Sequence, residues 1–167
     1  MLASLDELLT ANASTGRYLS GNQLNEVARF LQHGSDSLKA ASFFTNNSST
    51  LVADSLRKFI DQQPSLVGLG GILNDQAKLA ACIRDLDLFL RFISYCVIAG
   101  NSTILEDNLL NGMREVYTSL GVSLSLMITA IRLLRDETIK GLAQENYSKP
   151  VQDSVSDYFK LIIEALQ

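Results

Sequence analysis

Apolar residues recur at intervals of three and four along most of the chain, which places them on one face of a helix. Leu56, Phe59 and Ile60 show this spacing in one stretch, and Tyr158 and Leu161 show it in another. The alternating pattern of a half-buried strand is scarce, and the chain has only two prolines. The pattern predicts an all-α protein.

Capping and breaking residues divide the apolar pattern into about eight helices. Serine, aspartate and asparagine mark the expected starts, and glycine or proline marks the expected ends. Mixed helix lengths with short links predict globin-like packing instead of a simple four-helix bundle. The expected helices cover roughly residues 2–11, 20–33, 36–45, 51–63, 75–99, 103–120, 125–142 and 151–166.

We expect a single domain over residues 1–167, made of two parts. Residues 1–19 form an N-terminal helical extension, and residues 20–167 form the globin-like portion. The first helix carries leucines at helical spacing but is too short to be stable alone. Its leucines therefore need another surface, and we expect a partner subunit to provide it.

Composition and charge narrow the class of protein. The 167 residues are 47% hydrophobic and 19% charged, which is typical of a folded chain. A net charge of −4 without a Lys/Arg cluster argues against nucleic acid as a partner. The longest apolar run, residues 92–99, is too short to span a bilayer, and the first residues lack the basic start of a signal peptide. We expect an intracellular protein that spans no membrane.

Catalytic and metal-binding residues are scarce. The one histidine, His33, precedes Gly34 at an expected helix end, where it can cap carbonyl groups. Cys82 and Cys96 lie 14 positions apart, about 21 Å along a helix, so they cannot bridge each other within it. The glycine-rich stretch 68–71 lacks the Lys-Ser/Thr of a phosphate loop. We expect neither an enzyme, nor a metal site, nor a haem pocket.

One cluster of reactive side chains stands near the start of the long apolar run at residues 79–99. Lys78, Cys82 and Asp85 fall on one face of the expected helix, and Arg84 lies further round it. The residues alone leave two interpretations open. Cys82 is either a buried structural cysteine beside a surface ion pair, or a thioether anchor in a cavity for one elongated, charged and apolar molecule.

The segment Ala80-Ala81-Cys82-Ile83-Arg84-Asp85-Leu86-Asp87 closely resembles the bilin-attachment helix of phycobiliproteins, particularly of β-type allophycocyanin subunits. The resemblance covers the whole chain. Further matching segments are Gly16-Arg17-Tyr18-Leu19, Gly70-Gly71, and residues 104–107, 110–112, 114–117, 119–122 and 158–159.

The resemblance implies one phycocyanobilin, an open-chain tetrapyrrole, joined by a thioether to Cys82. Asp85 would accept hydrogen bonds from the pyrrole N–H groups and balance the charge of the protonated ring system. Arg84 and Lys78 would pair with the two propionates. The remaining residues implied near the pigment are Tyr117 and three apolar wall residues, Leu79, Leu86 and Phe89.

Several positions depart from the family pattern. Ala77 and Lys78 stand in place of two arginines, Leu88 and Phe89 replace a tyrosine pair, and Ile72 occupies the site of a modified asparagine. Because Ala77 and Lys78 replace two arginines, propionate binding should be weaker. The C-terminal region lacks the second attachment cysteine of phycocyanin-type β chains, so the resemblance implies a single bilin.

The resemblance also implies partners. The N-terminal helices would join an α-type allophycocyanin subunit in an αβ unit, with Arg91 retained at the contact and Ala13 in place of its acidic residue. Such units would form ring trimers with linker proteins in a phycobilisome core, peripheral to the thylakoid membrane on its cytoplasmic or plastid stromal face. The implied function is excitation-energy transfer; the alternative is a globin-like sensor or stress regulator that binds little or no pigment.

Overall fold

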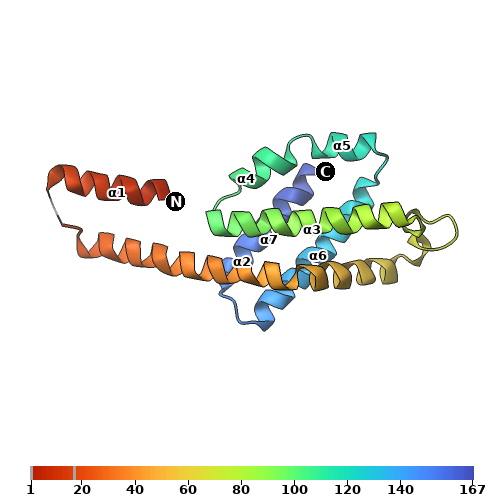
Figure 1. Ribbon diagram of the computed structural model, residues 1–167, viewed down its shortest axis with the longest axis horizontal. Coiled ribbons are helices and arrows are strands. Elements are labelled where there is room, and N and C mark those ends of the chain that lie inside the picture. Colours follow the sequence, from red (N-terminus) through yellow and green to blue (C-terminus); the bar gives the residue numbers. More distant parts are fainter. Residues whose placement is uncertain (1, 17) are drawn as a thin grey trace.

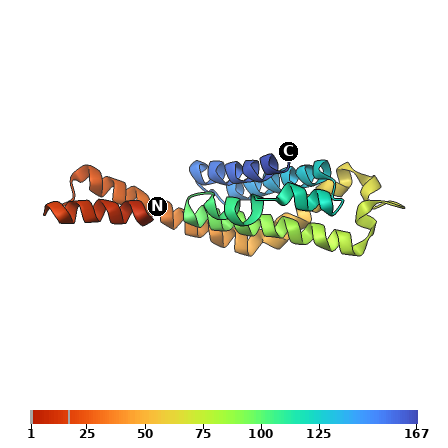
Figure 2. The ribbon, with the colours of Figure 1, turned by 90° about the horizontal axis from the view of Figure 1, so that it is seen from above.

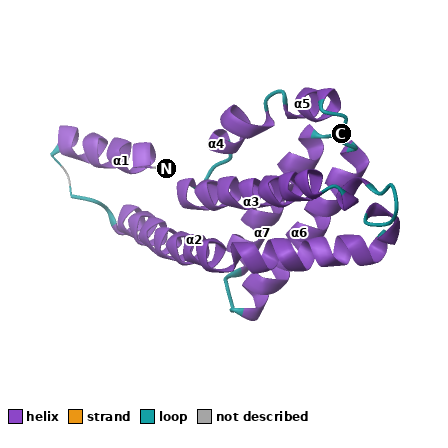
Figure 3. Ribbon diagram, turned by 45° about the vertical axis from the view of Figure 1, so that its right-hand side comes forward, coloured by secondary structure: helices purple, strands orange, loops and turns teal. Residues whose placement is uncertain are grey.

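Every regular element of the described residues is helical, which confirms the all-α class (Figure 3). The computed structural model describes the backbone of residues 2–16 and 18–167, and the side chains of residues 9–16, 18–25, 27–28 and 34–167. Within this part of the chain, no helix combines the length and apolar character that a membrane span requires. The elements are α1 (Leu2–Thr15), α2 (Gly21–Gln62), the 3₁₀ helices η1 (Pro64–Leu66) and η2 (Ile72–Asn74), α3 (Gln76–Ala99), α4 (Thr103–Leu105), the π-helix η3 (Glu106–Leu110), α5 (Met113–Ser119), α6 (Leu124–Gln144) and α7 (Lys149–Ala165).

Several predicted helix ends are confirmed. Ser20 and Gln23 form a reciprocal capping box at the start of α2. The carboxylate of Asp75 accepts hydrogen bonds from two backbone amides of the first turn of α3. Gly100 ends that helix in the left-handed conformation, with φ 68°, and Pro150 lies in the first turn of α7. Local capping chemistry therefore sets these boundaries.

The prediction of three helices between residues 20 and 63 is wrong, because α2 runs unbroken from Gly21 to Gln62. Gly34 stays inside the helix. The amide nitrogen of Asn47 donates to the carbonyl of Phe43 at 3.0 Å, so this polar side chain is satisfied within the helix. Phe44 and Val52, on either side of the expected break, are both buried. Burial of this face outweighs the weak helix propensity of the intervening residues.

The prediction of a single helix over residues 103–120 is also wrong. The structure divides this stretch into α4, η3 and α5. Asn111 is extended and Gly112 adopts a left-handed φ of 73°, so the chain turns between η3 and α5. Glycine is the residue that takes this conformation without steric cost.

The core lies where four long helices cross. α3 packs against α2 and α7, and α6 packs against α2 and α7 (Figure 1). The side chains at the centre are apolar and almost fully shielded from solvent, and they come from these helices and the short segment α4. They include Leu86, Phe89, Leu90, Ile93, Leu105, Ile131, Leu134, Leu142, Val155, Phe159 and Ile162.

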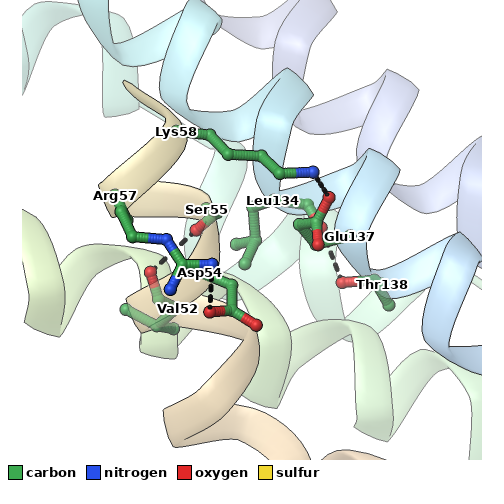
Figure 4. A network of polar contacts seen from close by, with 8 residues as sticks. All are labelled: Val52, Asp54, Ser55, Arg57, Lys58, Leu134, Glu137 and Thr138. Carbon is green, nitrogen blue, oxygen red and sulfur yellow. Dashed lines mark hydrogen bonds and ion pairs between the residues drawn. The ribbon is translucent and has the colours of Figure 1, made fainter. Parts of the chain in front are cut away.

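An ion pair joins α2 to α6 at the edge of this core (Figure 4). Lys58 donates a hydrogen bond to Glu137, whose side chain is buried although its partner is half-exposed. The next residue, Thr138, donates its hydroxyl to the Leu134 carbonyl, one turn earlier in α6, at 2.7 Å. The sequence pattern did not reveal this pair, because its members lie 79 positions apart.

An N-terminal arm projects beyond the other helices. α1 runs back along the first part of α2, and both extend away from the remaining helices (Figures 1 and 2). Leu9, Leu24 and Leu38 are exposed, and Tyr18 is fully exposed. The side chains of Leu2, Leu5, Leu8, Arg17 and His33 lie outside the described residues. Pairing through this arm and a boundary near residue 19 stay predictions; α2 runs from the arm into the core.

Candidate functional site

A cavity of about 160 Å³ lies beside the first half of α3. Three of its polar lining residues, Lys78, Cys82 and Asp85, come from α3. The remaining lining residues come from α2, η2, the turn before α6, α6 itself and, for Ala81, α3. They are mostly apolar and consist of Phe59, Ile72, Leu73, Ala81, Leu120, Gly121, Val122, Ser123, Leu126, Met127 and Ala130.

The shared orientation of the three α3 residues follows from where the helix begins. The Asp75 cap starts α3 at Gln76, so Lys78, Cys82 and Asp85 lie on successive turns of one face. Lys78 is exposed, whereas Cys82 and Asp85 are half-buried. The structure thus brings a cation, a thiol and a carboxylate to one cavity.

The carboxylate is held from a second element. The Tyr117 hydroxyl on α5 donates a hydrogen bond to Oδ2 of Asp85 at 3.0 Å. Burial, followed by the charge of Asp85, raises the pKa of Tyr117 far above its ordinary value, so the phenol remains a donor at neutral pH. A carboxylate offers about four lone-pair positions. Asp85 therefore keeps acceptor capacity for a further ligand.

The two cysteines occupy different environments. Burial and, second, the neighbouring carboxylate of Asp85 raise the pKa of Cys82 to about 11, so its thiol is protonated at neutral pH. Cys96 is fully buried in the core, and its backbone carbonyl accepts a hydrogen bond from the Tyr158 hydroxyl at 3.2 Å. Only the thiol of Cys82 faces a cavity that a ligand could enter.

The other residues implied by the resemblance do not line this cavity. Arg84 is exposed and lines a different hollow, between α2 and α3, because two residues correspond to about 200° around a helix. Leu86 and Phe89 are fully buried in the core, and Leu79 packs against it. The face of α3 that carries Cys82 enters the core one turn later, so Leu86 and Phe89 fix that face in the core beyond the cavity.

The sequence did not predict which residues of α6 and η2 form part of the cavity wall. Met127 and Ala130 of α6 follow ordinary core periodicity, which does not distinguish a cavity wall from a packed interior. The turn at residues 64–74 brings η2 close because Gly71 has no side chain. A Cβ there would lie 2.3 Å from the carbonyl oxygen of Leu66. The glycine pair predicted this turn but not the wall that it positions.

Comparisons with known proteins identify the family. The model of the family described as "Phycobilisome protein" matches residues 7–166. The R-phycocyanin-1 beta chain of Porphyridium purpureum is 32% identical over 156 residues, covering 93% of this chain and 90% of the relative. The C-phycocyanin beta chain of Galdieria sulphuraria is 34% identical over 139 residues, 83% and 81% of the two chains. The C-phycocyanin beta subunit of Mastigocladus laminosus is 36% identical over 126 residues, 75% and 73%.

The helical fold and these matches define a phycobiliprotein, a light-harvesting pigment protein and not an enzyme. The chain belongs to the phycobilisome protein family. The resemblance to phycobiliproteins is thereby confirmed. These relatives are named as phycocyanin β chains, so the narrower likeness to allophycocyanin stays a prediction.

Proposed function

We propose that this chain is a β-type phycobilisome subunit that carries one bilin on Cys82 and transfers excitation energy to neighbouring pigments. One observation carries the proposal. Cys82 shares a cavity with the half-buried carboxylate of Asp85 and the exposed ammonium group of Lys78. These groups lie on the helix that resembles the attachment helix of the family, and the relatives are phycocyanin β chains.

The donor set fits a bilin. A bilin supplies strong absorption of visible light when bound, and it presents pyrrole N–H groups and two propionates. Asp85 can accept from the N–H groups, and its negative charge favours a protonated ring system. Among the described side chains, neither Lys78 nor Arg84 forms an ion pair, so both cations are available to propionates. Arg84 can serve only a propionate that reaches the other side of α3.

The size of the cavity limits how the pigment is held. Pockets that enclose a drug-sized ligand measure about 300–1,000 Å³, whereas this cavity measures about 160 Å³. The cavity therefore takes only the part of the pigment nearest Cys82. The remainder lies over the surface of this chain or beneath a partner subunit. Assembly with a partner would then complete the rigid environment that keeps a bilin from losing excitation as heat.

The number and type of pigment follow from the cysteines and the resemblance. The chain has two cysteines, and Cys96 is fully buried. One thioether-linked bilin is therefore proposed, of the phycocyanobilin type. A single attachment site favours an allophycocyanin-like role in the phycobilisome core over a phycocyanin-like role. The absorption and emission spectra of the assembled subunit distinguish these two roles.

The proposed partners are an α-type allophycocyanin subunit, further αβ units in a ring trimer, and linker proteins. The exposed apolar side chains on the arm, Tyr18, Leu24 and Leu38, support pairing through α1 and α2. In this assembly the chain would lie at the surface of the thylakoid membrane, on the cytoplasmic or plastid stromal side.

The deciding experiment is covalent pigment attachment. The full chain is produced with a bilin supply and a bilin lyase, and bound pigment is detected by zinc-enhanced fluorescence on a denaturing gel. The Cys82→Ala variant should be colourless, and the matched Cys96→Ala variant should keep its pigment. If Cys96→Ala lost the pigment and Cys82→Ala kept it, the assignment of Cys82 as the attachment site would be overturned. A colourless wild-type chain would favour the sensor or regulator instead.

A further inference from the structure

The surroundings of Cys82 suggest how its reactivity is controlled, an inference that rests on the proposed function. Two charged side chains line its cavity, Asp85 and Lys78, both from α3. Tyr117 from α5 contacts Asp85, and the walls from α2, η2 and α6 carry no ionisable side chain. Lys78 is exposed, so water screens its charge, whereas Asp85 is half-buried. The carboxylate is therefore the charge that Cys82 experiences most strongly.

A carboxylate in this position suppresses the reactive form of the thiol. The thiolate, not the thiol, is the nucleophile of cysteine. A second negative charge one helical turn from Asp85, in a half-buried cavity, is unfavourable. The Tyr117 hydroxyl donates a hydrogen bond to the Asp85 carboxylate at 3.0 Å and holds that carboxylate beside the thiol, which maintains this repulsion. The raised pKa of Cys82, about 11, agrees in direction with the geometry.

We propose that Asp85 and Tyr117 hold Cys82 as an unreactive thiol until a cationic ligand neutralises the Asp85 carboxylate. In the bare chain, the pair protects the thiol from adventitious electrophiles. When a protonated tetrapyrrole pairs with Asp85, the repulsion is removed and the thiolate becomes accessible beside its target. Asp85 and Tyr117 thus act as positioning residues that couple recognition of the pigment to attachment.

The attachment step balances without a further reagent. Cys82 loses its proton, and its sulfur forms an S–C bond to one carbon of a polarised C=C of the pigment. The π bond of that C=C breaks, and the neighbouring carbon takes up a proton. The addition has no leaving group and no net oxidation or reduction. Only the protonation state of Cys82 needs to change for the reaction to begin.

The test uses the full chain without pigment, in a Cys96→Ala background where Cys82 is the sole thiol. Thiolate formation is followed by its ultraviolet absorbance against pH, after subtraction of the Cys82→Ala spectrum. Circular dichroism checks that each variant remains folded. This titration reports ionisation directly, whereas an alkylation rate also depends on access of the reagent to the thiol. Alkylation rates with iodoacetamide at pH 8 give a second measurement.

Asp85→Asn should lower the titration midpoint of Cys82 from about 11. Burial contributes more than the carboxylate to that value, so we expect about three- to tenfold more thiolate at pH 8, and alkylation faster by the same factor. Tyr117→Phe removes the hydrogen bond that holds the Asp85 carboxylate beside the thiol, so it should lower the midpoint, by less than Asp85→Asn does. Asp87→Asn, whose carboxylate pairs with Arg91 away from the cavity, is the matched control and should change neither quantity.

An unchanged midpoint in Asp85→Asn would overturn the inference, as would an equal decrease in Asp87→Asn. An unchanged or raised midpoint in Tyr117→Phe would show that Tyr117 has no part in it. These outcomes are independent of pigment attachment. If Asp85→Asn leaves the midpoint unchanged while wild-type Cys82 still acquires a bilin, the proposed function stands and this inference fails. If Cys82 acquires none, the proposed function fails whatever the titration shows.

Discussion

Gly141 sets the distance between α6 and α2, and substitution by alanine tests how tightly the two helices pack. A Cβ at this position would lie 2.8 Å from Cζ of Phe43 and 3.4 Å from its Cε2. The Phe43 ring is buried and makes edge contacts with Phe44 and Tyr147, with ring centroids 5.8 and 5.6 Å apart. Because these rings confine Phe43, it has little freedom to move away from an added methyl group.

Two effects of opposite sign decide the outcome of Gly141→Ala. Replacing a glycine within a helix by alanine stabilises the folded state by about 1 kcal/mol. Forcing an extra carbon into a packed contact costs about 1–3 kcal/mol. We therefore expect a net loss of up to about 2 kcal/mol in the free energy of unfolding. Gly34 of α2 is the matched control, since a Cβ there meets no atom within 4 Å, and Gly34→Ala should stabilise by about 0.4–1 kcal/mol.

Urea denaturation followed by circular dichroism measures both free energies of unfolding. If Gly141→Ala stabilised the chain as much as Gly34→Ala, the contact with Phe43 would carry no cost and the reasoning would be refuted. A double-mutant cycle sharpens the test, because leucine at position 43 lacks Cζ. Phe43→Leu destabilises by itself, but in that background alanine at position 141 should cost less than it does in the wild type.

Two further predictions concern polar contacts in the core. Lys58→Met leaves the buried carboxylate of Glu137 unpaired and should destabilise the chain by about 1–3 kcal/mol in urea denaturation. This loss is smaller than for a fully buried pair because Lys58 is half-exposed. If adding Glu137→Leu reduces the loss, the cost comes from the unpaired carboxylate and not from the lost packing of the lysine side chain. Tyr158→Phe removes the hydroxyl that donates to the Cys96 carbonyl and should cost about 0.5–1.5 kcal/mol in urea denaturation. Tyr147→Phe, whose hydroxyl bond is exposed, should cost less, and an equal cost would contradict the role of burial.

Helix boundaries were predictable where one residue decides them and unpredictable where tertiary packing does. Asp75 and Gly100 identify both ends of α3, because a cap and a left-handed glycine act within one turn. Gly34 and Asn47 suggested breaks in α2 that do not exist. Phe44 and Val52, on either side of Asn47, are buried against other helices, and a single sequence does not show which surfaces those helices offer.

The candidate site shows the same difference between local rules, which predict, and tertiary contacts, which a single sequence does not reveal. Helical spacing alone places Lys78, Cys82 and Asp85 on one face, and the structure has them around one cavity. The bond between Tyr117 and Asp85 joins residues 32 positions apart, and no local rule predicts it. The spacing of Arg84 places it on the side of α3 away from Cys82, and the structure agrees, because Arg84 lines the hollow between α2 and α3.

The position of Cys82 along α3 would let one helix both anchor the proposed pigment and stabilise the fold. As far as Asp85 the helix faces the small cavity, and from Leu86 onward the same face is buried in the core. A core-bound helix cannot rotate or shift without moving Leu86 and Phe89, which are close-packed on all sides. The thiol and carboxylate are therefore held rigidly although they stand at the surface. Since the cavity is too small to enclose a whole bilin, the proposed partner subunit would have to cover the rest of the pigment. Under that proposal, emission should strengthen when a pigmented chain assembles with its partner.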